Sequence, residues 1–211
     1  MFTRASHSHR RGLSAAAGGL SLLASLALAA LTALPAQAAW QLDPARSAIE
    51  ATVIEITPSG PVPHQHRVRE LSGSIGDDGT LRLPLRLSQT DIPQRLGGLP
   101  VWLKGMAELP LATLVTRLPP ERLNKLAVGD SLTETLTFQV DAKGVNQQEP
   151  LALRFTRESE SRVRIATAER VAVDGRELMA NPTLRTVILL LGYEQIGDEV
   201  PVTLDATLIE R

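Results

Sequence analysis

The sequence of 211 residues contains no cysteine, few aromatic residues and no excess of basic residues. The absence of cysteine excludes disulfide bonds, a lipid-anchored N-terminal cysteine and a thiol nucleophile. Aromatic residues make up only 3% of the chain, so Leu, Val, Ile and Ala must form most of the core. Basic and acidic residues alternate without the clustered basic face that nucleic acid requires, so we expect no nucleic-acid partner.

The N-terminus has the organisation of a secretory signal peptide. Three arginines (Arg4, Arg10 and Arg11) precede an uncharged stretch rich in Leu and Ala over residues 13–34, and the sequence Pro-Ala-Gln-Ala follows it. Small residues at the third and first positions before a cut fit signal peptidase, so we predict that residues 1–38 are cleaved off. An uncleaved membrane anchor is the alternative, because the stretch is nearly long enough to span a bilayer. Cleavage would leave a periplasmic domain of residues 39–211 with 19 basic and 23 acidic residues.

Apolar and polar residues alternate along much of this domain, a pattern typical of strands with one buried face. The clearest runs are 81–88, 132–140, 151–156 and 200–208, and weaker ones are 49–56, 71–75, 111–118 and 163–173. About eight antiparallel strands follow, and closing them into an elongated, lipocalin-like β-barrel would remove the exposed sheet edges. The inward side chains are of medium size, so a hollow interior and a filled one both fit the pattern.

Minor helices are expected at three places in this all-β chain. Asn181 as N-cap and Pro182 at the first helical position predict a C-terminal helix over residues 183–191, which packs on the barrel or caps it. We interpret residues 91–108 as a long excursion that contains at most a short helix. A helical turn is expected over residues 120–126.

The mature N-terminus, residues 40–49 (WQLDPARSAI), resembles the opening of the YceI-like family, in which an aromatic residue and Asp-Pro lead into the first strand. Residues 71–75, 107–113 and 184–202 resemble later parts of that family in the same order. The resemblance implies a periplasmic barrel that encloses a polyisoprenoid, a quinone or a fatty-acid-like lipid. Arg46 stands where the family usually has His, and we interpret it as a surface ion-pair partner. Ala51 stands where the family usually has Phe. This smaller side chain would widen the cavity.

We therefore predict a binding or carrier protein and no enzyme, with burial of a long apolar chain worth about 0.8 kcal/mol per methylene. The predicted ligand-binding residues lie on the apolar phase of their strands, in the excursion or in the C-terminal helix: Ala51, Val53, Trp102, Met106, Leu136, Phe138, Leu153, Phe155, Val187 and Leu191. Simple core packing would produce the same pattern. We expect a bound lipid, no cofactor and no metal. We also expect transient contact with a membrane, and a homodimer is one possible oligomeric state.

Two other classes of function stay open. A metal-assisted enzyme would use His64 and His66, whose spacing places both imidazoles on one side of an extended segment. Their proline-rich surroundings instead favour a solvated loop, and the sequence offers no Ser-His-Asp set or phosphate-binding glycine loop. A partner-binding envelope module would have a solid barrel and dock another protein through an exposed edge or flap.

Overall fold

The computed structural model describes residues 40–118, 120–142 and 145–210. The predicted signal peptide, residues 1–38, lies outside them. The strands are β1 (Trp40–Leu42), β2 (Ala48–Thr57), β3 (Gly60–Val68), β4 (Thr80–Arg86), β5 (Pro110–Arg117), β6 (Ser131–Ala142), β7 (Val145–Ser159), β8 (Arg162–Thr167), β9 (Val171–Asp174) and β10 (Glu199–Glu210). The helices are α1 (Ile92–Arg95), α2 (Val101–Lys104), α3 (Pro120–Asn124), α4 (Gly175–Ala180) and α5 (Pro182–Leu190), with 3-10 turns η1 (Pro44–Arg46) and η2 (Leu87–Gln89).

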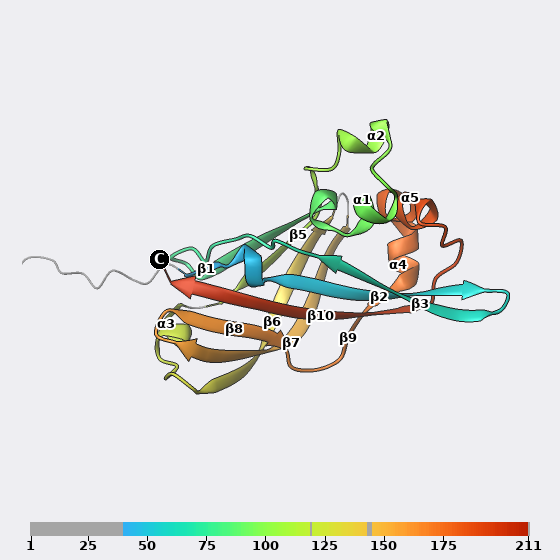
Figure 1. Ribbon diagram of the computed structural model, residues 1–211. Coiled ribbons are helices and arrows are strands. Elements are labelled where there is room, and N and C mark those ends of the chain that lie inside the picture. The colour runs from blue at the N-terminus through green and yellow to red at the C-terminus, as the bar shows by residue number, and fades with distance from the viewer. Residues whose placement is uncertain (1–39, 119, 143–144, 211) are drawn as a thin grey trace, which may run out of the picture. The chain divides into compact units, whose positions relative to one another are not determined.

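All the strands belong to one antiparallel sheet that curls into a half-barrel (Figure 1). Eight of them follow in the order β3-β2-β10-β8-β7-β6-β5-β4, and β1 and β9 pair with β10. This arrangement confirms the predicted lipocalin-like antiparallel fold of about eight strands with few helices. The alternation of the sequence explains it, because strands such as β4 and β6 bury every second residue on one face. In β4, for example, Leu81 and Leu83 are buried while Arg82 is exposed.

The edges of the sheet, β3 and β4, are not joined by a ladder in the part of the chain that the structure describes. Residues 69–79, which we call the seam segment, lie between them. The seam segment buries Leu71 and Ile75 in the core, and a single bridge, Val68 to Thr90, continues from the end of β3. Gly73 touches β4 so closely that a Cβ atom there would lie 2.6 Å from the carbonyl oxygen of Arg82. Side-chain packing and a few hydrogen bonds therefore close this side.

Several predicted elements differ from the observed ones. The proline-rich segment around His64, interpreted as a loop, is strand β3, and it tolerates Pro61 and Pro63 because an edge strand need not donate every backbone N–H. The predicted strand 71–75 forms only isolated bridges at Ser74 and Ile75. The predicted run 163–173 is divided between β8 and β9, and the excursion 91–108 contains two short helices.

Helix α5 begins as the sequence predicts. The Asn181 side chain accepts hydrogen bonds from the backbone N–H groups of Thr183 and Leu184, at 3.0 and 3.2 Å. Gly192 follows the helix with a φ of 90°, a conformation that favours glycine. This turn reverses the chain and places Tyr193 among the buried residues. Helix α3 confirms the predicted turn at residues 120–126, whereas α4 was not predicted.

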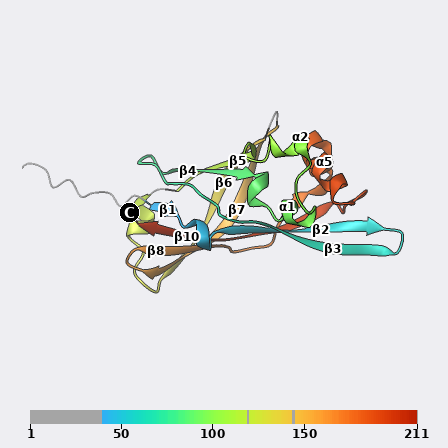
Figure 2. The ribbon, with the colours of Figure 1, turned by 45° about the horizontal axis from the view of Figure 1, so that its top comes forward.

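The buried residues form three hydrophobic clusters. The main cluster fills the curled sheet and contains Trp40, Leu136, Phe155 and Leu208. The second joins Val53 of β2 to Ile188 of α5, together with Tyr193, Ile196 and Val200. The third joins Leu87, Leu103 and Val187, so that α2 packs against α5. Figure 2 shows α1, α2 and α5 together at one end of the sheet, and the second and third clusters therefore cover that end.

Candidate functional site

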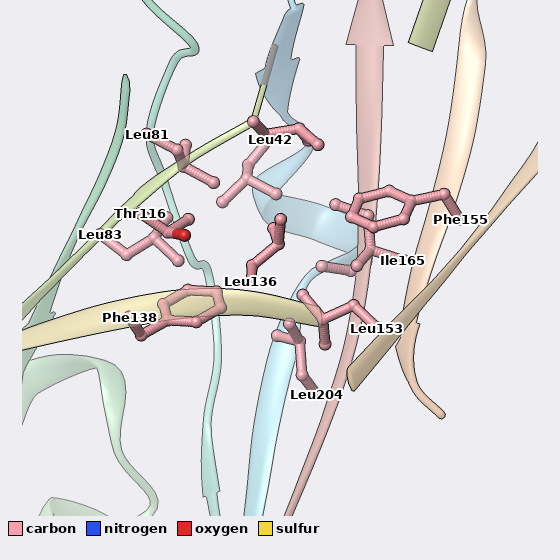
Figure 3. A pocket seen from close by; sticks show the side chains of 12 residues that line it. Leu42, Leu81, Leu83, Thr116, Leu136, Phe138, Leu153, Phe155, Ile165 and Leu204 are labelled. Carbon is pink, nitrogen blue, oxygen red and sulfur yellow. The ribbon is translucent and has the colours of Figure 1, made fainter. Parts of the chain in front are cut away.

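The first candidate site is a small apolar cavity inside the main cluster (Figure 3). Its walls come from β1, β4, β5, β6, β7, β8 and β10 and from Leu118, the residue after β5. They are Leu42, Leu81, Leu83, Thr116, Leu118, Leu136, Phe138, Leu153, Phe155, Ile165, Leu204 and Ala206. The only polar side chain among them is Thr116, whose hydroxyl donates to the carbonyl of Thr137 at 3.0 Å. The lining therefore offers an apolar guest no unpaired polar group.

The cavity is much smaller than a lipid. Its volume is about 20 Å³, measured as the space open to the centre of a water molecule, which is roughly what one water needs. Medium-sized side chains thus fill most of the interior, and the walls must separate before a long chain can occupy it.

Four predicted ligand-binding residues, Leu136, Phe138, Leu153 and Phe155, lie side by side in the cavity wall. They come from the neighbouring strands β6 and β7, in which Leu136 pairs with Leu151 and Leu153 with Glu134. Sequence reasoning missed the other eight wall residues. Leu81, Leu83, Leu204 and Ala206 carried the same alternating signal in their strands, whereas Leu42 and Thr116 showed no distinctive pattern.

The other predicted residues lie near α5 and the excursion. Ala51, Val53 and Leu191 belong to the second cluster. Met106 and Val187 belong to the third. Trp102 is 55% exposed and belongs to neither cluster. The predicted set is therefore divided between the interior, the end covered by helices and the surface.

A second candidate site, which we call the histidine cluster, lies on the face of β2 and β3 that carries Val53, next to the second hydrophobic cluster. It contains Glu55, His64, His66, Asp91, Arg95 and Tyr193. The register pairs Val53 with His64 and Ala51 with His66, so both imidazoles share the inward face of β2. His64 Nε2 lies 2.8 Å from Glu55 Oε2, and the His64 ring stacks on Tyr193 with 4.3 Å between ring centroids.

His66 links three segments of the chain through this cluster. Its Nδ1 lies 3.2 Å from Asp91 Oδ1, and its Nε2 lies 3.3 Å from the Tyr193 hydroxyl. Asp91 in turn accepts from Arg95 Nε at 2.6 Å, and Arg95 also donates to the carbonyl of Gln65. The cluster thereby ties the β2–β3 hairpin, the start of α1 and the segment after α5 together.

The electrostatics assign the protons in this chain of hydrogen bonds. Burial lowers the pKa of His66, against the opposing effect of Asp91, so the ring is neutral at pH 7. Burial would raise the pKa of Asp91, but Arg95, the Arg67 backbone N–H and His66 outweigh it and the net pKa is lowered. An ionised Asp91 only accepts, so His66 Nδ1 carries the proton. Burial raises the pKa of Tyr193, and its hydroxyl donates to His66 Nε2.

This geometry corrects the interpretation of His64 and His66 as parts of a solvated loop. Both lie in a strand, and each has its own carboxylate partner, Glu55 of β2 for His64 and Asp91, the residue before α1, for His66. Across the described residues, no three His, Asp or Glu side chains are placed to hold one metal ion. Arg46 lies at the surface, 3.9 Å from Asp43, in keeping with the ion pair expected of it.

The end of the sheet that carries α3 is closed by a different set of contacts. Trp40 Nε1 donates to Asn124 Oδ1 at 2.9 Å, and the Arg157 guanidinium lies over the Trp40 ring at 5.1 Å from its centroid. Arg157 also donates to the carbonyl of Leu123 at 3.0 Å. These contacts hold α3 against the main cluster.

In the ranges 40–118, 120–142 and 145–210, no helix has the length and hydropathy needed to cross a membrane. Neither a family model nor a curated protein matches the sequence. Among solved structures, the chain is similar to a polyisoprenoid-binding domain from Saccharophagus degradans implicated in plant cell wall breakdown. The two chains are 21% identical and superpose with a TM-score of 0.65, and the match covers 82% of this chain and 99% of the other. The protein therefore has the polyisoprenoid-binding-domain fold that its resemblance to the YceI-like family implies.

Proposed function

We propose that this protein binds a long-chain amphiphile of the polyisoprenoid, quinone or fatty-acid class in the interior of its curled sheet. The observation that carries the proposal is the wall of the cavity, which is apolar except for one internally bonded hydroxyl. The shared fold with a polyisoprenoid-binding domain supports it. Binding proceeds by burial of methylene groups, at about 0.8 kcal/mol each, and needs no bond chemistry.

We propose that the cavity enlarges when the seam segment, between β3 and β4, is displaced. Elsewhere around the sheet, separating two strands would break a continuous ladder such as the β6–β7 pairing. At the seam it would break isolated bonds, including those from Leu42 N to the Gly73 carbonyl and from Ile75 N to the Trp40 carbonyl, both 2.8 Å. Because each net hydrogen bond contributes about 1 kcal/mol, displacing the seam segment is the least costly way to admit a chain.

We also propose that the protein acts in the periplasm after residues 1–38 are removed. The arginines followed by a Leu- and Ala-rich stretch and an Ala-x-Ala site support this location. A carrier there would shield an apolar chain from water between membranes.

Lipid extraction and native mass spectrometry of the purified mature protein test the proposal. We expect a co-purified species of defined mass, and tight binding of an isoprenoid alcohol after it is stripped. A protein that is empty as isolated and binds neither isoprenoid alcohols nor long-chain fatty acids would refute it.

A second candidate is an envelope module that has a solid interior and docks another protein on its surface. The small volume of the cavity favours it, as do the exposed apolar residues of α2. Native mass spectrometry separates the two, since the module would carry no lipid whatever its surface binds.

A further inference from the structure

Glu134 is a charged residue at a position of β6 where the alternating pattern predicts an apolar one. It lies two residues before Leu136 in β6 and pairs with Leu153 of β7. Side chains two residues apart in a strand, and side chains directly opposite each other on paired strands, lie on the same face of a sheet. Leu136 and Leu153 both line the cavity, so the Glu134 side chain lies on the cavity side of the sheet.

The two oxygens of the Glu134 carboxylate have different surroundings. Oε1 accepts a hydrogen bond from Arg122 Nη1 at 2.6 Å, and the Arg122 side chain is 56% exposed. Oε2 is buried, and no donor among the described residues bonds to it. In that part of the chain it is the only buried side-chain oxygen or nitrogen without a hydrogen-bond partner. A buried acceptor without a donor is costly, and more so when it is charged, so Oε2 indicates a partner from outside the chain.

We propose that Glu134 Oε2 binds the polar end of the amphiphile and selects headgroups that donate a hydrogen bond. This inference rests on the proposed function and narrows its ligand class. The ion pair with Arg122 requires an ionised carboxylate, which only accepts. A hydroxyl or an amide N–H can donate to it. A quinone carbonyl has no proton to donate, and a fatty-acid carboxylate would bring a second negative charge against Oε2.

The position of Glu134 also gives the bound ligand a direction. Its partner Arg122 belongs to α3, which Figure 1 shows at one end of the sheet. The next cavity residues along β6 are Leu136 and Phe138. The headgroup therefore lies at the α3 end, and the apolar chain extends along β6 past these two side chains.

An ordered water is the alternative donor to Oε2. A buried water typically needs about three polar partners. The cavity wall contains a single polar side chain, Thr116, and its hydroxyl already donates to the carbonyl of Thr137. The apolar surroundings therefore favour the hydroxyl of an amphiphile, whose chain is itself apolar.

The test measures the dissociation constants of geranylgeraniol, its methyl ether and geranylgeranic acid for the stripped mature protein. The three ligands share one apolar chain, and only the alcohol can donate a hydrogen bond at neutral pH. We expect the alcohol to bind the wild type about 10- to 100-fold more tightly than the ether or the acid, as the loss of one hydrogen bond to a charged group predicts.

Glu134→Gln should abolish this preference. Gln has nearly the same shape as Glu, and its carbonyl oxygen can keep the bond from Arg122, which places the amide NH2 where Oε2 lies in the wild type. The NH2 group donates to an alcohol, an ether and a carboxylate alike. The alcohol should therefore lose its advantage over the ether, and the acid should bind this variant more tightly than it binds the wild type.

Asp205→Asn is the matched control. Asp205 is also a strand carboxylate paired with an arginine, but both of its oxygens accept from Arg164. It lies on the face of β10 opposite to the wall residues Leu204 and Ala206, so this variant should keep the wild-type preference.

Equal affinities of the alcohol and the ether for the wild type, which a water bound to Oε2 would produce, would overturn the inference and leave the proposed function intact. An unchanged preference in Glu134→Gln would also overturn it. If none of the three ligands binds the wild type, the proposed function fails together with the inference.

Discussion

Replacing Leu136 by Ala tests whether the interior is a binding site or a solid core. Leu136 is 6% exposed, lies in β6 and lines the cavity. Its truncation adds space directly to the existing volume of about 20 Å³. Leu→Ala changes at such positions cost about 2–5 kcal/mol. For a domain of this size the melting temperature should fall by roughly 5–15 °C.

A ligand should then restore much of the lost stability. Because the variant needs less displacement of the walls, an isoprenoid alcohol should bind it more tightly than it binds the wild type. A ligand present at about 1,000 times its Kd stabilises by about 4 kcal/mol, which is comparable to the loss. Thermal unfolding followed by circular dichroism, with and without the alcohol, measures both effects.

Leu123→Ala is the control for this experiment. Leu123 in α3 is also buried, but it does not line the cavity. This variant should lose similar stability and gain no more from the alcohol than the wild type does. If the alcohol stabilised neither the wild type nor Leu136→Ala, or rescued Leu123→Ala equally well, the interior could not be the binding site.

Three further predictions address the walls and the end covered by helices. The folded-state pKa of His66 is lowered, so below about pH 6.5 the unfolded chain binds more protons than the folded protein does. The free energy of unfolding should therefore decrease from about pH 6.5 down to the folded-state pKa. His66→Phe should flatten this slope when unfolding is measured as a function of pH. Ala51→Phe should shorten the longest chain bound in lipid-exchange measurements by filling space beside the second cluster, whereas Thr52→Phe, on the other face of β2, should not. Val68 bridges Thr90 and the chain has no other cysteine, so a Val68→Cys/Thr90→Cys variant can form one disulfide across the seam. The disulfide should slow lipid uptake, and its reduction should restore the rate. Equal uptake rates in the oxidised and reduced variant would exclude the seam as the route.

The strands were predictable where one face of the strand is buried. In β6, Leu136 and Phe138 alternate with exposed Thr135 and Thr137, and this periodicity is a local property of the sequence. Strand β3 was not predictable in the same way. Its prolines signal a loop, and only its position at the edge of the sheet, which depends on all the other strands, lets them remain in a strand.

The two candidate sites also differ in how far they could be predicted from local sequence patterns. Four cavity residues were predicted because they lie on the apolar face of their strands. The histidine cluster was not predicted, because Glu55, Asp91 and Tyr193 come from three segments that are distant from one another in the sequence. No spacing rule connects His66 with Tyr193, whose contact spans 127 positions.

The sequence by itself determined the fold class, the apolar lining of the sheet and the capped C-terminal helix, because alternation and capping act between residues that are near neighbours in the chain. The tertiary structure decided how tightly the interior is filled, where the barrel has its seam, and which carboxylate each histidine meets. Those properties depend on volumes and distances between residues that only the folded sheet brings together.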